Sequence, residues 1–323
     1  MMDNIKDINS ILNDIQNECV LLYDNIRNHI FSDIDYYSIV GLVPIWIRDA
    51  GNSAECGLSK ELFEKLIVAN NNTLTNKFLY VYDCDMMVAS LQDRFSMLGA
   101  LIDKFYKRIG AESSYNMEDF DSATMTMSEM DADVFAYLNS IFIFLGSSFD
   151  LLTKISSELK NINTTDYSLY PKLKSKNVQF GDFKLIHEEL REETIFSKPN
   201  IVKKIESIRN RIVHDGSFDF RQIIYIGYIE EDNYSESCIM FPDFEDSQFV
   251  SFKNRRNFYS KSDRINLMLP DILKEILEVI LNTVKKINLL YHKEMYINEN
   301  DIITYKEDIC NWNKSALTVF QKE

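Results

Sequence analysis

Apolar residues recur at every third or fourth position over long stretches of this chain, and this spacing constrains the fold more than any other feature. The longest stretch covers residues 128–160, where the apolar positions form one continuous face of a helix: Val134, Leu138, Ile141, Leu145, Phe149, Leu152, Ile155 and Leu159. Similar spacing predicts further helices over residues 3–31, 60–68, 83–109, 184–193, 270–292 and 300–322. The sequence therefore predicts a mainly α-helical fold.

Capping residues stand where several of these helices are expected to begin. Ser128 opens a capping box, and Ser59 offers a hydroxyl in front of the shorter helix. Asp83 or Asp85 could cap the helix that follows. Pro270 is expected in the first turn of its helix, where the missing N–H costs nothing.

The hydrophobic period changes beyond residue 220. Residues 222–229 and 237–241 are rich in isoleucine, tyrosine and phenylalanine, and they flank a polar turn at 230–236. This pattern predicts a β-hairpin, to which residues 248–253 could add a third strand. We therefore expect a small sheet inserted between two helices of a bundle.

Three parts are expected along the chain. Residues 1–82 would form an N-terminal helical extension, and residues 83–293 a helical domain with the β insertion at about 220–253. Residues 294–323 would form a C-terminal helical tail.

Composition narrows the class of protein. The chain has 323 residues, of which 46% are hydrophobic, so it can bury a substantial core. Its five cysteines are scattered and lack any C-x-x-C pair, which indicates a reducing compartment and no zinc site. No apolar run approaches a membrane span, and no basic segment precedes an apolar one at the start. We therefore expect a cytoplasmic protein without a membrane segment.

A second amphipathic pattern ends in a cluster of chemically useful side chains. Ile201, Ile205, Ile208 and Ile212 mark a helix that Ser197 and Pro199 would open and that Asp215-Gly216 would end. Arg209, Asn210 and His214 lie in its last turns. At that end the helix dipole favours the protonated form of His214.

These residues resemble the motif of the HEPN superfamily, in which an arginine, often followed by asparagine, precedes a histidine by four to six residues. Here the motif is Arg209-Asn210 and His214, with four residues between arginine and histidine. The resemblance implies an all-helical bundle that often dimerises and that, in catalytic members, is a metal-independent endoribonuclease. Such proteins often act in toxin–antitoxin or antiviral systems. Arg27, Asn28 and His29 are adjacent and are interpreted as helix surface.

The motif residues suit that chemistry on their own terms. A histidine titrates near neutral pH and can transfer protons at the 2′-hydroxyl or the leaving oxygen. The planar fork of Arg209 suits the charge that develops on phosphorus. Asn210 shares a helix face with His214 and could orient its ring. Arg209 lies about 140° around the helix from His214, so a two-fold dimer could combine residues of both copies.

The net charge of the chain argues against RNA binding, whereas the charge of the segment that leads into the motif does not. The net charge is −15, which opposes a polyanion, but residues 161–215 carry ten basic and eight acidic side chains. Possible substrate-binding or supporting residues are Arg211, Asp215, Lys203, Lys204, Arg255 and Arg256. Scattered cations more often face solvent without a ligand.

Two classes of function remain open. The first is an RNA endonuclease, active as a homodimer, without metal or other cofactor and with a possible antitoxin or regulatory protein as partner. The second is a non-catalytic HEPN-like dimer that binds a protein or nucleotide, because an arginine can simply pair with a carboxylate and a histidine can simply cap a helix. A metal- or nucleotide-dependent enzyme is disfavoured, since the sequence has no ligand cluster and no phosphate-binding loop.

Overall fold

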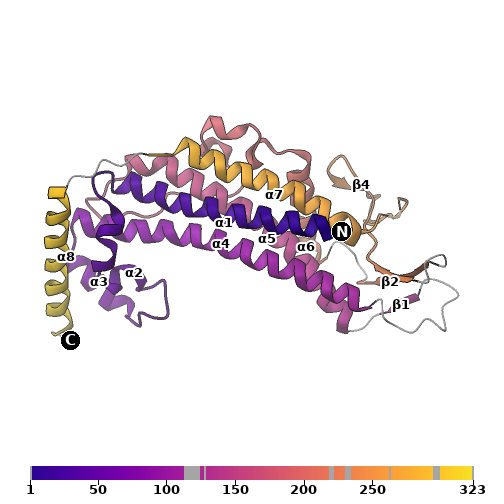
Figure 1. Ribbon diagram of the computed structural model, residues 1–323, viewed down its shortest axis with the longest axis horizontal. Coiled ribbons are helices and arrows are strands. Elements are labelled where there is room, and N and C mark those ends of the chain that lie inside the picture. Colours follow the sequence, from indigo (N-terminus) through magenta and orange to yellow (C-terminus); the bar gives the residue numbers. More distant parts are fainter. Residues whose placement is uncertain are drawn as a thin grey trace. The chain divides into compact units, whose positions relative to one another are not determined.

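A computed structural model describes residues 2–112, 124–126, 129–217, 222–229, 234–261, 263–293 and 299–321. Long helices dominate it (Figure 1): α1 (Met2–Ile30), α4 (Thr73–Glu112), α5 (Glu129–Asn161), α6 (Asn200–Asp215), α7 (Ile265–Leu290) and α8 (Glu299–Phe320). Two shorter helices are α2 (Ile45–Asp49) and α3 (Lys60–Ala69), and the 3-10 turns are η1 (Tyr36–Ser38), η2 (Val40–Leu42), η3 (Ile162–Thr164), η4 (Phe183–Leu185), η5 (Glu188–Arg191) and η6 (Ile195–Ser197). The predicted mainly α-helical fold is confirmed.

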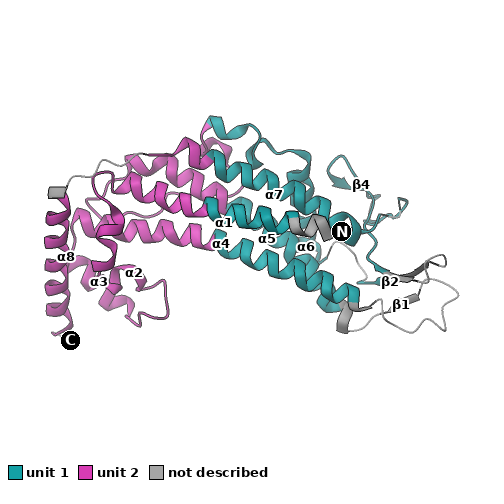
Figure 2. Ribbon diagram, viewed as in Figure 1, with its two compact units in different colours: residues 1–18, 91–150, 188–286 teal, residues 19–90, 151–187, 287–323 magenta. Residues whose placement is uncertain are grey.

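The chain divides into two compact units (Figure 2). Unit 1 consists of residues 1–18, 91–150 and 188–286, and unit 2 of residues 19–90, 151–187 and 287–323. The unit borders in α1, α4, α5 and α7 fall inside helices rather than in linkers. The border that we expected between residues 82 and 83 lies inside α4.

Unit 1 buries the apolar stripes on which the helix predictions rest. Its core draws on α1, α4, α5, α6 and α7, with buried side chains that include Ile8, Leu12, Ile15, Phe95, Leu98, Ile102, Val134, Leu138, Ile141, Leu145, Ile276 and Ile280. The capping box at Ser128 lies outside the described residues.

Helix α7 begins earlier than predicted, and Pro270 lies inside it rather than in its first turn. Proline lacks an N–H, so the carbonyl of Asn266, four residues before, loses its helical donor. The hydroxyl of Tyr106 on α4 donates to that carbonyl at 2.9 Å. The tyrosine thus replaces the bond that proline removes, which allows the helix to start at Ile265.

The β insertion lies between α6 and α7, as predicted, but its pairing differs from the expectation. β2 (Ile224–Ile229) and β3 (Tyr234–Cys238) form the predicted antiparallel hairpin, but β3 begins at Tyr234, inside the stretch of 230–236 that was expected to be the turn. β1 (Thr124–Thr126), from the polar stretch before α5, pairs with β2 and supplies the third strand. β5 (Gln248–Phe249) pairs instead with β4 (Phe244–Glu245) in a separate two-stranded sheet. The expectation that residues 248–253 extend the first hairpin is therefore wrong.

In unit 2, the interpretation of Arg27 as helix surface is wrong. Its side chain is 17% exposed and donates to Asp85 on α4 at 2.9 Å. The guanidinium also lies over the rings of Tyr23, Tyr36 and Tyr37, with its carbon 4.9, 5.0 and 5.6 Å from their centroids. Burial raises the pKa of Asp85 to about 6, because the loss of water outweighs the attraction of Arg27. Arg27 therefore lies partly buried among these side chains, although Tyr37 at the edge of the cluster is exposed.

A buried and a half-buried carboxylate of unit 2 hold the segment that follows η3. Glu158 on α5 is 2% exposed, and it accepts hydrogen bonds from the Tyr80 hydroxyl and from the N–H groups of Lys174 and Ser175 at 3.3 and 2.8 Å. Asp83 on α4 accepts a bond from the Tyr170 hydroxyl at 2.6 Å. Since this segment has little regular structure, these bonds replace the ladder that a helix or strand would provide.

Two predicted helix limits are corrected. Helix α4 starts at Thr73, where the side chain of Asn72 accepts from the N–H of Thr75 at 2.9 Å, and not at Asp83 or Asp85. Residues 184–193 form 3-10 turns η4 and η5 instead of an α-helix. The predicted cap of α3 is confirmed, because the Ser59 hydroxyl accepts from the N–H of Leu62 at 3.2 Å.

The expectation that no apolar run approaches the length of a membrane span is wrong for α5 and the residues that follow it. Residues 132–164 are long and apolar enough to cross a membrane, with a mean hydropathy of 1.5 over the tested window, half of which is buried. A buried core helix of a soluble protein has the same properties.

All five cysteines are free thiols.

Candidate functional site

Helix α6 presents the motif residues as the sequence predicts, although it starts differently. Ile201, Ile205, Ile208 and Ile212 are all buried. The left-handed Gly216 (φ 87°) ends the helix, and its N–H bonds to the carbonyl of Ile212 at 3.0 Å. Pro199 stands at the N-cap without a side-chain cap, and the Ser197 hydroxyl donates instead to the carbonyl of Thr194 at 2.7 Å. The predicted stripe and end are confirmed, and the predicted cap at Ser197 is wrong.

Arg209 lies in close contact with helix α5. A Cβ added at Gly146 would come within 2.9 Å of the Arg209 Cγ, so the absence of a side chain there makes room for the arginine stem. Arg209 is half-buried, and its guanidinium donates to the amide oxygen of Asn210 at 3.1 Å. The contact between α5 and α6 thus fixes the position of the aliphatic part of the Arg209 side chain.

Asn210 and His214 are not brought together by a hydrogen bond in the part of the chain that is described. The Asn210 amide oxygen accepts from Arg209, so the expectation that this amide orients the histidine ring is replaced by a role beside Arg209. His214 is exposed in the last turn of α6, and its ring has no hydrogen-bond or ion-pair partner among the described residues. The ring is therefore free to meet a ligand.

A second face of α6 holds the segment of residues 244–257. Ser207, Arg211 and Asp215 are spaced four residues apart, so they form one row along the helix. The Ser207 hydroxyl donates to the carbonyl of Ser247 at 2.6 Å, and Asp215 pairs with Arg256. These two contacts fix both ends of the segment on the row.

Arg211 contacts the same segment at two places, its last residues and Phe249. Its guanidinium donates to the carbonyl of Arg256 at 2.8 Å and to the amide oxygen of Asn257. The guanidinium carbon also lies 4.2 Å from the ring centroid of Phe249. Arg211 and Asp215, predicted as substrate-binding or supporting residues, thus hold the segment of residues 244–257 against α6. The spacing of four residues was a signal for this row, but Ser207, Phe249 and Asn257 did not stand out in the sequence.

A cavity of about 560 Å³ opens where this segment meets the end of α6. Its lining residues are Arg211, Asp215, Ser217, Asn254, Arg255, Arg256 and Asn257. Of the motif helix, Arg211 and Asp215 line the cavity, whereas His214, which lies between them in the sequence, does not. Three arginines against one carboxylate give it a net positive lining, which suits an anionic ligand.

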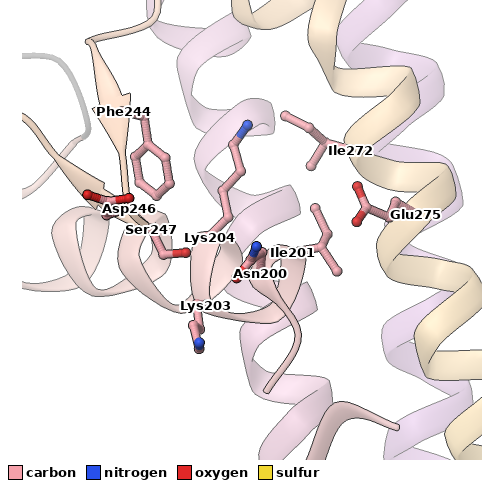
Figure 3. A pocket seen from close by; sticks show the side chains of 9 residues that line it. All are labelled: Asn200, Ile201, Lys203, Lys204, Phe244, Asp246, Ser247, Ile272 and Glu275. Atoms are coloured by element: carbon pink, nitrogen blue, oxygen red, sulfur yellow. The ribbon is translucent and has the colours of Figure 1, made fainter. Parts of the chain in front are cut away.

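Lys203 and Lys204 lie at the other end of α6. Eleven residues at about 1.5 Å each separate Lys203 from His214 by about 16 Å along the helix axis. Both lysines line a separate cavity of about 500 Å³, together with Glu275 and Asp246 (Figure 3).

Within that cavity, Lys204 extends between Phe244 and Ile272. Its nitrogen is 5.6 Å from the ring centroids of Phe241 and Phe244, and burial lowers the pKa of Lys204. These two lysines therefore do not join the motif residues at one site.

If the motif cleaves RNA, as its resemblance to HEPN proteins implies, Gly146→Ala is expected to reduce the cleavage rate by roughly tenfold, because the new methyl group would displace the Arg209 stem and with it the guanidinium. The measurement is the cleavage rate, together with the melting temperature. Gly99→Ala is the matched control, since a Cβ there meets Leu12 at an ordinary 3.5 Å. Equal rates for wild type and both variants would show that the Arg209 position has no effect on the reaction.

Metal ligands are not gathered at the motif. Among the residues that the structure describes, no three His, Cys, Asp or Glu side chains are grouped so that they could hold a metal ion.

Comparison with protein-family models, with curated proteins and with solved structures gives no match.

Proposed function

We propose that this chain is a metal-independent endoribonuclease of the HEPN type. His214 would transfer protons, Arg209 would bind the reacting phosphate, and Asn210 would hold Arg209 in place. The observation that carries the proposal is the end of α6, where His214 is exposed without a partner among the described residues, and where its helix neighbours Arg211 and Asp215 line a cavity that holds three arginines. A histidine so placed can reach both a proton and a polyanion.

The proposed reaction balances without a metal or a cofactor. A base takes the proton of the 2′-hydroxyl, the 2′-oxygen bonds to phosphorus, and the bond from phosphorus to the 5′-oxygen breaks. The 5′-oxygen then takes up a proton, which leaves a 2′,3′-cyclic phosphate and a 5′-hydroxyl. The arginine offsets the negative charge on the phosphorane oxygens.

A symmetric homodimer is part of the proposal. Arg209 contacts α5 through Gly146, whereas His214 lies about 140° further around α6 and is exposed. Two-fold pairing of two helix ends would place the Arg209 of one copy near the His214 of the other. The free cysteines agree with a cytoplasmic enzyme, and the HEPN resemblance favours a role in toxin–antitoxin or antiviral defence, with an antitoxin or other regulatory protein as partner.

The proposed chemistry predicts that RNA cleavage persists in excess EDTA and yields a 2′,3′-cyclic phosphate or the 3′-phosphate formed from it. The reason is that none of the proposed steps uses a metal ion. The products would be identified by mass spectrometry after incubation of the purified protein with RNA. Loss of cleavage in EDTA and its return with magnesium would overturn the proposal.

The alternative is a non-catalytic HEPN-like dimer that binds a protein or a nucleotide. One observation favours it: Arg209 is half-buried, packs on Gly146 and is hydrogen-bonded to Asn210, as a purely structural arginine would be. Under this alternative, the wild-type protein cleaves no RNA, and Arg209→Ala lowers the melting temperature.

A further inference from the structure

The segment beside His214 ends in a tight turn that exposes an aromatic ring. Phe252 and Arg255 exchange two backbone hydrogen bonds, each of 2.9 Å, and Lys253 between them has a left-handed backbone (φ 52°). Directly paired residues place their side chains on one face of the turn. Phe252 is 62% exposed, which is unusual for a large apolar side chain without a ligand.

The cations of this turn are available to a ligand. Arg255 is exposed and lines the cavity of about 560 Å³, and its guanidinium has no hydrogen-bond or ion-pair partner among the described residues. The Lys253 nitrogen is 5.4 Å from the ring centroid of Phe252. Residues 248–264 carry five basic and one acidic side chain in a chain whose net charge is −15, so the local field opposes the overall one.

The position of the turn relative to His214 is fixed. Arg211 bonds to Arg256 and Asn257, and Asp215 pairs with Arg256, so the residues just after the turn are tied to the last turn of α6. Arg211 and Asp215 are the neighbours of His214 on that side of the helix. A strand bound at the turn would therefore run past the motif histidine.

We propose that the turn of residues 252–255 binds single-stranded RNA. Phe252 stacks against one unpaired base, while Arg255 binds a phosphate on the same side of the turn. Stacking on an aromatic ring accepts any base but requires that the base be unpaired, which selects single strands over duplexes. The choice of RNA rests on the proposed function, whereas the site itself rests on the turn.

The test measures binding apart from cleavage. His214→Ala protein is titrated into a fluorescein-labelled single-stranded 12-nucleotide RNA, and into the same RNA as a duplex, with fluorescence anisotropy as the readout at several KCl concentrations. Adding Phe252→Ala is expected to weaken single-strand binding roughly tenfold without changing its salt dependence. Adding Arg255→Ala is expected to weaken binding and to lower the slope of log Kd against log [KCl] by about 0.7.

Two matched controls separate the turn from general effects. Phe320→Ala removes another exposed ring (42% exposed), and Lys176→Ala removes another exposed cation. Neither is expected to change RNA binding. Because all four residues are accessible to solvent, each variant is expected to keep the melting temperature of its parent.

The outcomes distinguish this inference from the proposed function. If the wild type never cleaves RNA but the two turn variants lose binding as described, the inference stands and the enzyme proposal falls. If the wild type cleaves RNA and the turn variants bind as tightly as their parent, the inference falls alone. Duplex binding as tight as single-strand binding, or no binding of either, also overturns the inference.

Discussion

Proteins carrying His214→Ala or Arg209→Ala are expected to cleave RNA at least about a hundredfold more slowly than the wild type. The first loses the group that transfers protons, and the second loses the charge that stabilises the phosphorane. Arg209→Lys should fail as well, because a single ammonium cannot replace a two-pronged donor. The exposure of His214 means that its removal should cost at most about 1 kcal/mol of unfolding free energy.

Cleavage rates and melting temperatures of the three variants would be compared with those of the wild type. His292→Ala, which removes another exposed histidine, and Arg108→Ala, which removes an arginine 3.4 Å from Asp133, serve as controls. Equal cleavage by wild type and all motif variants would end the enzyme interpretation at this site. A rate that falls only as far as the folded fraction falls would assign Arg209 and His214 to structure.

Mixing the two inactive variants tests the composite site. If the Arg209 of one copy serves the His214 of the other, a heterodimer of Arg209→Ala and His214→Ala contains one complete site. Random exchange of an equal mixture would then restore about a quarter of the sites. A mixture as inactive as its components, or a clean monomer in light scattering at micromolar concentration, would contradict a shared site.

Glu158→Ala is expected to lower the free energy of unfolding by about 3 kcal/mol or more. The carboxylate is 2% exposed and accepts bonds from Tyr80, Lys174 and Ser175, so its loss leaves buried donors without partners. Glu158→Gln keeps one acceptor oxygen and should cost less. Denaturation in urea, followed by circular dichroism, measures the change.

Glu64→Ala is the matched control for that change. Glu64 is 62% exposed, and its oxygen lies 3.6 Å from Lys60 in an i,i+4 pair, so its removal should cost less than about 1 kcal/mol. Wild-type stability in Glu158→Ala would show that the segment after η3 is held by its apolar contacts and not by the carboxylate.

The sequence predicted the helices better than their contacts. The stripes of α1, α5 and α6 recur because one face of each helix must be buried, and that requirement is written in the spacing itself. The starts of helices were less predictable, since several residues near each start can act as a cap. Asp83 and Asp85 looked like caps for this reason, and instead they bond to Tyr170 and Arg27 inside unit 2.

The candidate site was predictable in its residues and not in its surroundings. Arg209, Asn210 and His214 follow a local motif, so their places on α6 could be read directly. Arg209 packs on Gly146 of another helix, and Arg211 and Asp215 bond to residues 256–257. Each of these contacts joins positions more than forty residues apart in the chain. No local spacing contains that information.

Because the segments of the two units alternate along the chain, neither unit can be produced alone by shortening the gene. Each unit is assembled from three separated stretches of chain, so neither can be expressed by trimming one end. A cut after residue 82 would remove the first part of α1, with Ile8, Leu12 and Ile15, from the core of unit 1. Truncation would therefore expose apolar surface in both products, and point substitutions in the undivided chain are the way to assign a role to either unit.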